Sequence, residues 1–153
     1  MERIYSARKD FAVARSEFID AHNAADIAVR RLLASIGKSP AVMLSANIEA
    51  MLKAPAAPQY PKAEKARIEG LLKELKNLGS IRCGIVHSRM ELISVHANLH
   101  ACFSNVQSQP RFGRKGLILS LSDLQAVTEE ISRIERKLVV QNKVPQLARQ
   151  AAA

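Results

Sequence analysis

Cysteine is scarce in this sequence, and its scarcity excludes one class of protein. Only Cys83 and Cys102 occur among the 153 residues, too few for the disulfide framework that stabilises small secreted domains. The first residues, MERIYSARKDF, lack the apolar core of a signal peptide. No apolar run approaches the roughly 20 residues that a membrane span requires. We therefore expect a reduced, cytoplasmic protein without a membrane-spanning segment.

Aromatic residues are also few, with no Trp, two Tyr and four Phe. The hydrophobic class makes up 48% of the chain and consists mainly of Ala, Leu, Ile and Val, which suit closely packed helices better than a β-sandwich. A chain of this length is typical of one domain with one core. The composition predicts an all-α fold.

Several familiar catalytic motifs are missing. The sequence contains no Walker-type glycine-rich loop, no Rossmann glycine pattern, no HExxH and no GxSxG. Nucleotide hydrolysis, hydride transfer, zinc proteolysis and serine hydrolysis therefore have no support from motifs.

Basic residues are in excess, with 23 Lys and Arg against 14 Asp and Glu, a formal charge of +9 and a pI near 10.0. Such a balance favours an anionic partner, RNA or DNA first, because long-ranged attraction raises the local concentration of polyanions. A basic surface that only keeps the protein in solution is the alternative.

Apolar residues recur at helical spacing in four regions. The pattern predicts a long helix over 3–36, a shorter one over 41–53, a helix from Lys62 that continues past Gly79, and a final helix over 122–141. Gly37 stands where a helix stop is expected, and the prolines of residues 55–61 predict a loop. A bundle of this kind should bury Phe11, Phe18, Leu32, Leu72, Leu75, Ile131 and Ile134.

The spacing of apolar residues changes in the region before the final helix. Residues 101–106 and 117–121 predict two short extended segments around the turn-rich SQPRFGRKG, hence a small β-hairpin. Ser122 and Gln125 have the spacing of a capping box. The tail QLARQAAA has no apolar stripe, so we expect one domain over 1–144, a bundle of about four to five helices, and a disordered tail over 145–153.

The segment LGSIRCGIVHSR places Arg82 and His87 near the end of the third long helix, with four residues between them. In this the chain resembles the HEPN superfamily, whose helical bundles carry an R-x(4 to 6)-H motif at such a position. The order of elements is also similar, so the resemblance covers roughly residues 3–141. One residue departs from the pattern, because Cys83 occupies a place where these domains commonly have Asn or another polar residue.

The resemblance implies a HEPN-like fold and a homodimeric, metal-independent endoribonuclease that needs no cofactor. Five positions on a helix turn through about 140°, so Arg82 and His87 do not share a face; HEPN domains dimerise so that two motif helices face one another. His87 would move protons during attack of the ribose 2′-hydroxyl on the adjacent phosphate, and Arg82 would hold that phosphate. Such an enzyme would be a toxin or a phage-defence component, with an antitoxin or another protein as a partner.

Other residues are weaker candidates. Cys83, Asp20 and Asn23 are candidates to support the motif, although a solvated helix face explains the polar residues of the first helix equally. Cations around Phe112 and beside the motif could bind an RNA backbone; they are Arg89, Arg111, Arg114 and Lys115. His96 and His100 stand four residues apart without a persuasive further ligand, so we predict no metal site.

Two alternatives to the nuclease stay open. Arg82 could be a solvated cation and His87 a residue that favours the negative end of a helix dipole. The protein would then be a non-catalytic helical module that binds RNA, a nucleotide or a protein partner. A structural interaction domain with no role in nucleic-acid binding is the third reading.

Overall fold

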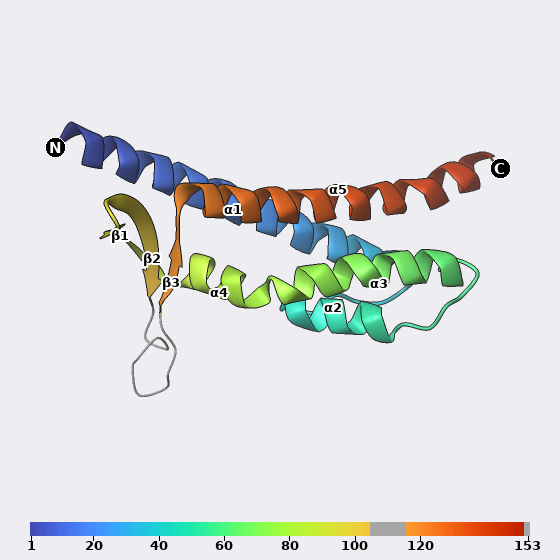
Figure 1. Ribbon diagram of the computed structural model, residues 1–153. Helices are drawn as coiled ribbons and strands as arrows, with labels where there is room; N and C mark the ends of the chain where they lie inside the picture. Colours follow the sequence, from blue (N-terminus) through green and yellow to red (C-terminus); the bar gives the residue numbers. More distant parts are fainter. Residues whose placement is uncertain (105–115, 152–153) are drawn as a thin grey trace, which may run out of the picture. The chain divides into compact units, whose positions relative to one another are not determined.

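The fold is mostly helical, as the composition predicts, and it also contains a small sheet. The computed structural model describes residues 1–104 and 116–151, and their side chains as far as residue 139. Along the chain it has helices and strands in this order (Figure 1): α1 (Glu2–Ser35), α2 (Leu44–Lys53), α3 (Lys62–Asn77), α4 (Gly79–His87), β1 (Arg89–Val95), β2 (Asn98–Ser104), β3 (Leu117–Leu119) and α5 (Leu121–Ala151).

These elements form two compact units, and both long helices contribute to each. Unit 1 comprises Met1–His22 and Gly79–Glu130, and unit 2 comprises Asn23–Leu78 and Ile131–Ala153. The sequence predicts one helix that continues through Gly79. Instead α3 ends at Asn77 and α4 begins at Gly79, where a glycine weakens helical continuity because its backbone loses most entropy on ordering. None of the helices in the described residues is long and apolar enough to cross a membrane.

Unit 1 contains the first part of α1, α4, the sheet and the start of α5. Its three strands are antiparallel in the order β1, β2, β3, and α4 lies against β2 and β3 (Figure 1). A Cβ on Gly84 would lie 3.1 Å from Cδ2 of Leu117, so the missing side chain allows α4 to approach β3. The buried hydrophobic residues of this unit are Phe11, Ala14, Phe18, Ile85, Ala101, Phe103 and Leu124.

The predicted hairpin is confirmed as the β2–β3 pair, in which Ala101 faces Leu119 and Phe103 faces Leu117. The connecting segment 105–115 lies outside the described residues. Strand β1, which pairs with β2 along its whole length, is not predicted by the sequence pattern. The reason lies in the turn between them, where His96 and Ala97 adopt φ values of 48° and 64°. Asn-Gly is the usual sequence for such a turn, and His-Ala gives no comparable signal.

The start of α5 has a capping box two residues earlier than the one predicted at Ser122 and Gln125. The Asp123 amide donates to Ser120 Oγ over 3.0 Å, and the Ser120 amide donates to Asp123 Oδ2 over 3.0 Å. The two residues thus satisfy each other's backbone donors, as a capping box requires. Hydrogen bonds from the side chain and then the backbone of Ser120 hold the pKa of Asp123 below its ordinary value.

Unit 2 contains the rest of α1 and α5 together with α2 and α3. Gly37 ends α1 with φ 77°, and the Lys38 amide donates to the Leu33 carbonyl over 3.0 Å, which together form the helix stop predicted at this glycine. Asn47 is buried, and its side-chain amide bonds both backbone groups of Ala41. These two hydrogen bonds hold residues 41–43 outside the helix, so α2 begins at Leu44 and not at Ala41.

The core of the chain follows the predicted stripes. All seven residues expected to be buried are at most 4% exposed. Across α3, Lys76 pairs with Glu49 of α2, and Glu74 pairs with Arg133 of α5, so α3 is joined to helices on both sides. Helix α5 runs to Ala151, past the end predicted near Gln141, and thus extends into residues 145–153, for which the sequence predicts a disordered tail.

Candidate functional site

Both motif residues lie on α4, in unit 1. Arg82 is half-buried near the middle of the helix, and His87 is exposed in its last turn. Because five helical positions turn through about 140°, the two side chains leave the helix in different directions. The helix therefore separates them, as the spacing predicts, and one copy of α4 does not place both on one face.

The guanidinium of Arg82 is held by His22 of α1. Its Nη1 lies 2.9 Å from Nε2 of His22, a ring that is only 9% exposed. An arginine has donors and no acceptor, so Nε2 must accept this bond. That requirement makes His22 a neutral imidazole with its proton on Nδ1. The positive charge of Arg82 is thus fixed in place by a buried neutral partner.

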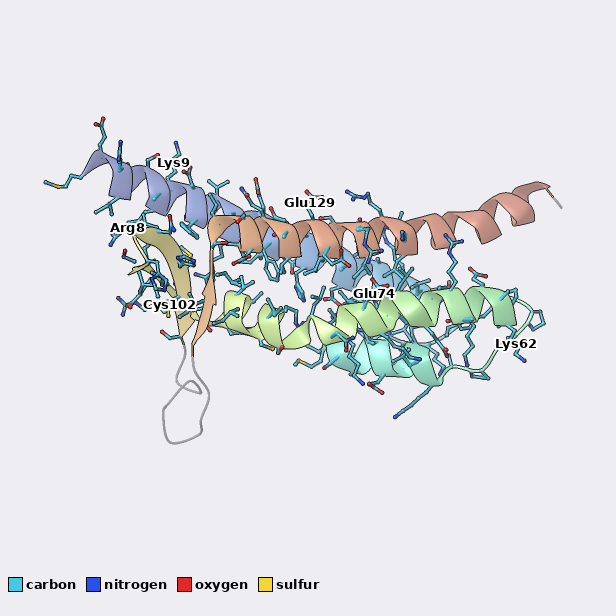
Figure 2. All side chains as sticks on the ribbon, in the orientation of Figure 1. Arg8, Lys9, Lys62, Glu74, Cys102 and Glu129 are labelled. Atoms are coloured by element: carbon cyan, nitrogen blue, oxygen red, sulfur yellow. The ribbon has the colours of Figure 1, made fainter. Side chains whose placement is uncertain are left out.

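Cys83 lies beside this pair. The Nη2 group of Arg82 donates to the Cys83 sulfur over 3.8 Å, and the thiol is exposed and free. The other cysteine, Cys102, is half-buried on β2 (Figure 2). The residue that departs from the HEPN pattern is therefore a neighbour of the motif arginine at the surface, and its sulfur is a weak acceptor for that guanidinium.

A second arginine of α1 binds the end of α4. Arg15 donates from Nε to the Ile85 carbonyl over 3.1 Å and from Nη2 to the Ser88 carbonyl over 2.6 Å. Its guanidinium also lies 5.7 Å from the centre of the Phe103 ring. Carbonyls in the last turn of a helix have no partner inside the helix. Arg15 satisfies that of Ile85 and also the Ser88 carbonyl just past α4, and it thereby fixes the backbone on either side of His87.

The contacts of His22 and Arg15 were not predicted, although the sequence contains a signal for both residues. The apolar stripe of α1 contains Phe11, Phe18 and Ala25, and Arg15 and His22 follow the two phenylalanines by four residues, which places them beside the stripe. A cation and a histidine at the margin of a buried stripe need partners in the fold. By the same geometry Asp20 and Asn23 project away from it, and both are exposed. The α1 residue that contacts Arg82 is His22.

The predicted RNA-binding cations are only partly described. Arg89 begins β1, is exposed, and forms an ion pair with Glu91 at 3.3 Å. Arg111, Arg114 and Lys115 lie outside the described residues. Arg89 thus lies close to the end of α4, one residue after Ser88. The positions of the other three cations are not described.

The remaining histidines lie on the β1–β2 hairpin. His96 is in the turn, and His100 on β2 has Nδ1 3.2 Å from the Asn98 carbonyl. Within residues 1–104 and 116–139, no three His, Cys, Asp or Glu side chains gather closely enough to hold a metal ion. The two histidines that the sequence places four residues apart are therefore in a turn and a strand and not on a shared helix face.

Charge is divided unequally between the two units. Unit 1 contains nine Lys and Arg and eight Asp and Glu, whereas unit 2 contains fourteen and six. All four histidines belong to unit 1. The groups suited to proton transfer and the excess of positive charge thus belong to different parts of the chain.

Comparison with known proteins gave no relative. No protein-family model, no curated protein and no solved structure matches the chain. The resemblance to HEPN domains therefore depends on Arg82, His87 and the order of the elements alone.

Proposed function

We propose that the chain is a metal-independent endoribonuclease of HEPN type, with Arg82 and His87 as its catalytic residues. The observation that carries the proposal is the Arg82–His22 contact, because it holds a guanidinium in a fixed position on the helix that also presents an exposed histidine. A cation that stabilises developing charge contributes most when it is already in place. The proposal keeps the role of a toxin or phage-defence component, with an antitoxin or another protein as a partner.

The reaction proposed is cleavage of the RNA backbone by its own 2′-hydroxyl. The 2′-oxygen forms a bond to the adjacent phosphorus, and the bond from phosphorus to the 5′-oxygen of the next nucleotide breaks. His87 accepts the 2′-hydroxyl proton or supplies one to the leaving oxygen, since imidazole titrates near neutral pH. Arg82 binds the phosphate oxygens and offsets their increasing negative charge.

The proposal requires a homodimer. Because Arg82 and His87 point in different directions from one α4 helix, a two-fold axis beside α4 would bring the two residues of one protomer together with those of its partner. Light scattering at tens of micromolar should give about twice the chain mass of 16.8 kDa. A strictly monomeric protein would contradict the catalytic assignment as well as the dimer.

The decisive experiment is cleavage of single-stranded RNA in the presence of a chelator. Wild type should cleave, and His87→Ala should be slower by roughly 10² to 10⁴ because it removes a general acid or base. Arg82→Ala should also be inactive, whereas His96→Ala, in the exposed hairpin turn, serves as the matched histidine control and should keep full activity. Circular dichroism checks that each variant is folded. Equal cleavage by wild type and His87→Ala would reject the proposal.

A non-catalytic module that binds RNA is the second candidate. The observation in its favour is that Arg82 is occupied by contacts within the fold, with His22 and with Cys83, as a structural arginine would be. Tight binding of RNA with no cleavage by wild type would select this candidate.

A further inference from the structure

Within unit 2, the neighbouring helices α2 and α3 carry several exposed lysines. We define the lysine face as Lys53 at the end of α2 and four residues of α3, namely Lys62, Lys65, Lys73 and Lys76. Lys53, Lys62, Lys73 and Lys76 are exposed, and Lys62 is seen at the start of α3 (Figure 2). Residues eleven positions apart on a helix differ by about 20° in direction, so Lys62 and Lys73 project from the same side of α3.

The acids near this face already have partners. Glu69 pairs with Lys65 at 3.6 Å, Glu49 pairs with Lys76, and Glu74 pairs with Arg133. Lys65 also donates to the Ala54 carbonyl over 2.6 Å. The remaining three lysines, Lys53, Lys62 and Lys73, form no ion pair within the part of the chain that the structure describes. Their ammonium groups are the ones available to a partner outside the chain, and the charge of Lys53 also adds to that of Lys76 in lowering the pKa of Glu49.

We infer that the lysine face of unit 2 binds the phosphate backbone of RNA through Lys53, Lys62 and Lys73. The inference rests on the proposed function, since it takes RNA as the ligand, and it assigns the affinity for RNA to a part of the chain other than α4. Lys62 and Lys73 are about 16 Å apart along the helix axis at 1.5 Å per residue, a distance suited to separate phosphates of one strand. An ammonium on a flexible stem recognises phosphate as a point charge and does not read the base sequence.

The separation of the three lysines favours RNA over a small anion as the ligand. A single phosphate would need converging donors, whereas these three lysines are spread over two helices and lie at the surface. A polyanion gains from separate contacts, because each neutralised phosphate releases a counterion. Binding at this face should therefore be sequence-independent and strongly dependent on salt.

The test is the salt dependence of binding to a fluorescently labelled oligouridine, measured by anisotropy in a His87→Ala background that does not cleave. Neutralisation of three single-strand phosphate contacts changes the slope of log K against log salt by about 2. The triple variant Lys53→Gln, Lys62→Gln, Lys73→Gln should show a slope that is shallower by this amount. Between 50 and 200 mM salt, the parent protein should lose about 20-fold more affinity than the triple variant.

The matched control removes the same number of charges from unit 1. Arg3, Arg8 and Lys9 are exposed on α1, and the last two extend from its N-terminal part (Figure 2). The variant Arg3→Gln, Arg8→Gln, Lys9→Gln should keep the slope of the parent. A slope that is equally shallower in both triple variants would show that net charge alone attracts the RNA. An unchanged slope in both would place the contacts elsewhere. Either result overturns the inference.

The outcome can be separated from that of the proposed function. Cleavage by wild type together with an unchanged slope in the lysine variant would reject the lysine face and keep the nuclease. A shallower slope without cleavage would keep the lysine face and select the binding module. If the parent does not bind oligouridine at all, the lysine face is rejected as an RNA-binding surface. An acidic protein partner is then the hypothesis to test next.

Discussion

Replacement of Arg15 by methionine should destabilise the protein more than any exposed substitution on α1. Methionine keeps the unbranched stem of the side chain and removes the guanidinium, so the two bonds to the Ile85 and Ser88 carbonyls are lost. Hydrogen bonds from a charged donor contribute about 1.5 to 3 kcal/mol each. The contact with the Phe103 ring adds roughly 0.5 to 1 kcal/mol.

The expected loss is smaller than the sum of these contributions, because carbonyls at the end of a helix can be hydrated once the arginine is gone. We expect a decrease of about 2 to 3 kcal/mol in the free energy of unfolding, for two carbonyls that water satisfies incompletely beside the buried Ile85 and Ser88. With an m-value of about 2 kcal/mol/M, the midpoint of urea unfolding should decrease by roughly 1 to 1.5 M.

Urea unfolding followed by circular dichroism measures this change. Arg31→Met is the matched control, because Arg31 is an exposed arginine of the same helix, and its free energy of unfolding should stay within about 0.5 kcal/mol of wild type. The free energy of unfolding of Arg15→Lys should lie between those of Arg15→Met and Arg31→Met, since an ammonium cannot reproduce the fork that reaches both carbonyls. If Arg15→Met is as stable as Arg31→Met, Arg15 does not hold the end of α4.

Further predictions concern the partner of Arg82 and the start of α5. His22→Leu removes the acceptor for Arg82 and should lower kcat about 10-fold with little change in KM, because a misplaced charge costs rate; His22→Gln, which restores an acceptor, should recover most of it, and equal kcat for both would contradict a positioning role. Ser120→Ala should lower the free energy of unfolding by about 1 kcal/mol through loss of the cap, whereas Ser122→Ala, which removes a hydroxyl contact with Ser120 Oγ and no bond to a backbone amide, should lower it by less. The folded state lowers the pKa of Asp123, so its contribution to stability is present above the ordinary carboxyl pKa and is lost as the pH falls through the lower folded value; the stability difference between wild type and Asp123→Asn should disappear in acid, and a difference that persists there would refute the assignment.

The approximate positions of the helices and the buried stripes could be predicted from apolar spacing, whereas exact helix ends such as the α3–α4 break at Gly79 could not. Stripes such as Leu72 and Leu75 on α3 or Ile131 and Ile134 on α5 are buried as expected, since a helix of this kind is stable only when its apolar face is covered. The strand β1 could not be predicted in the same way. Its turn is formed by His96 and Ala97 with positive φ values, a conformation for which Asn-Gly is the usual sequence signal.

The residues of the candidate site are proposed from the sequence, whereas their contacts are seen only in the structure. The spacing of Arg82 and His87 is visible in the sequence, but the partner of Arg82 lies 60 positions earlier in the chain. What the sequence does show is that His22 borders the buried stripe of α1 while Asp20 does not. A polar residue beside a buried stripe must find a partner, so its place around the helix is a better guide to a supporting role than its chemical type.

The roles proposed for Arg82 and His87 set opposite requirements, and the surroundings of the two residues differ in the same sense. A guanidinium that stabilises negative charge does so best when no reorganisation is needed, and Arg82 is held by a buried neutral ring. A histidine that transfers protons must exchange them with substrate and water, and His87 is exposed at the end of a helix whose last carbonyls are bound by Arg15. Since the two residues diverge by about 140° around α4, neither property produces a site within one chain. The catalytic proposal therefore depends on the dimer, whereas the lysine face can bind RNA in a monomer.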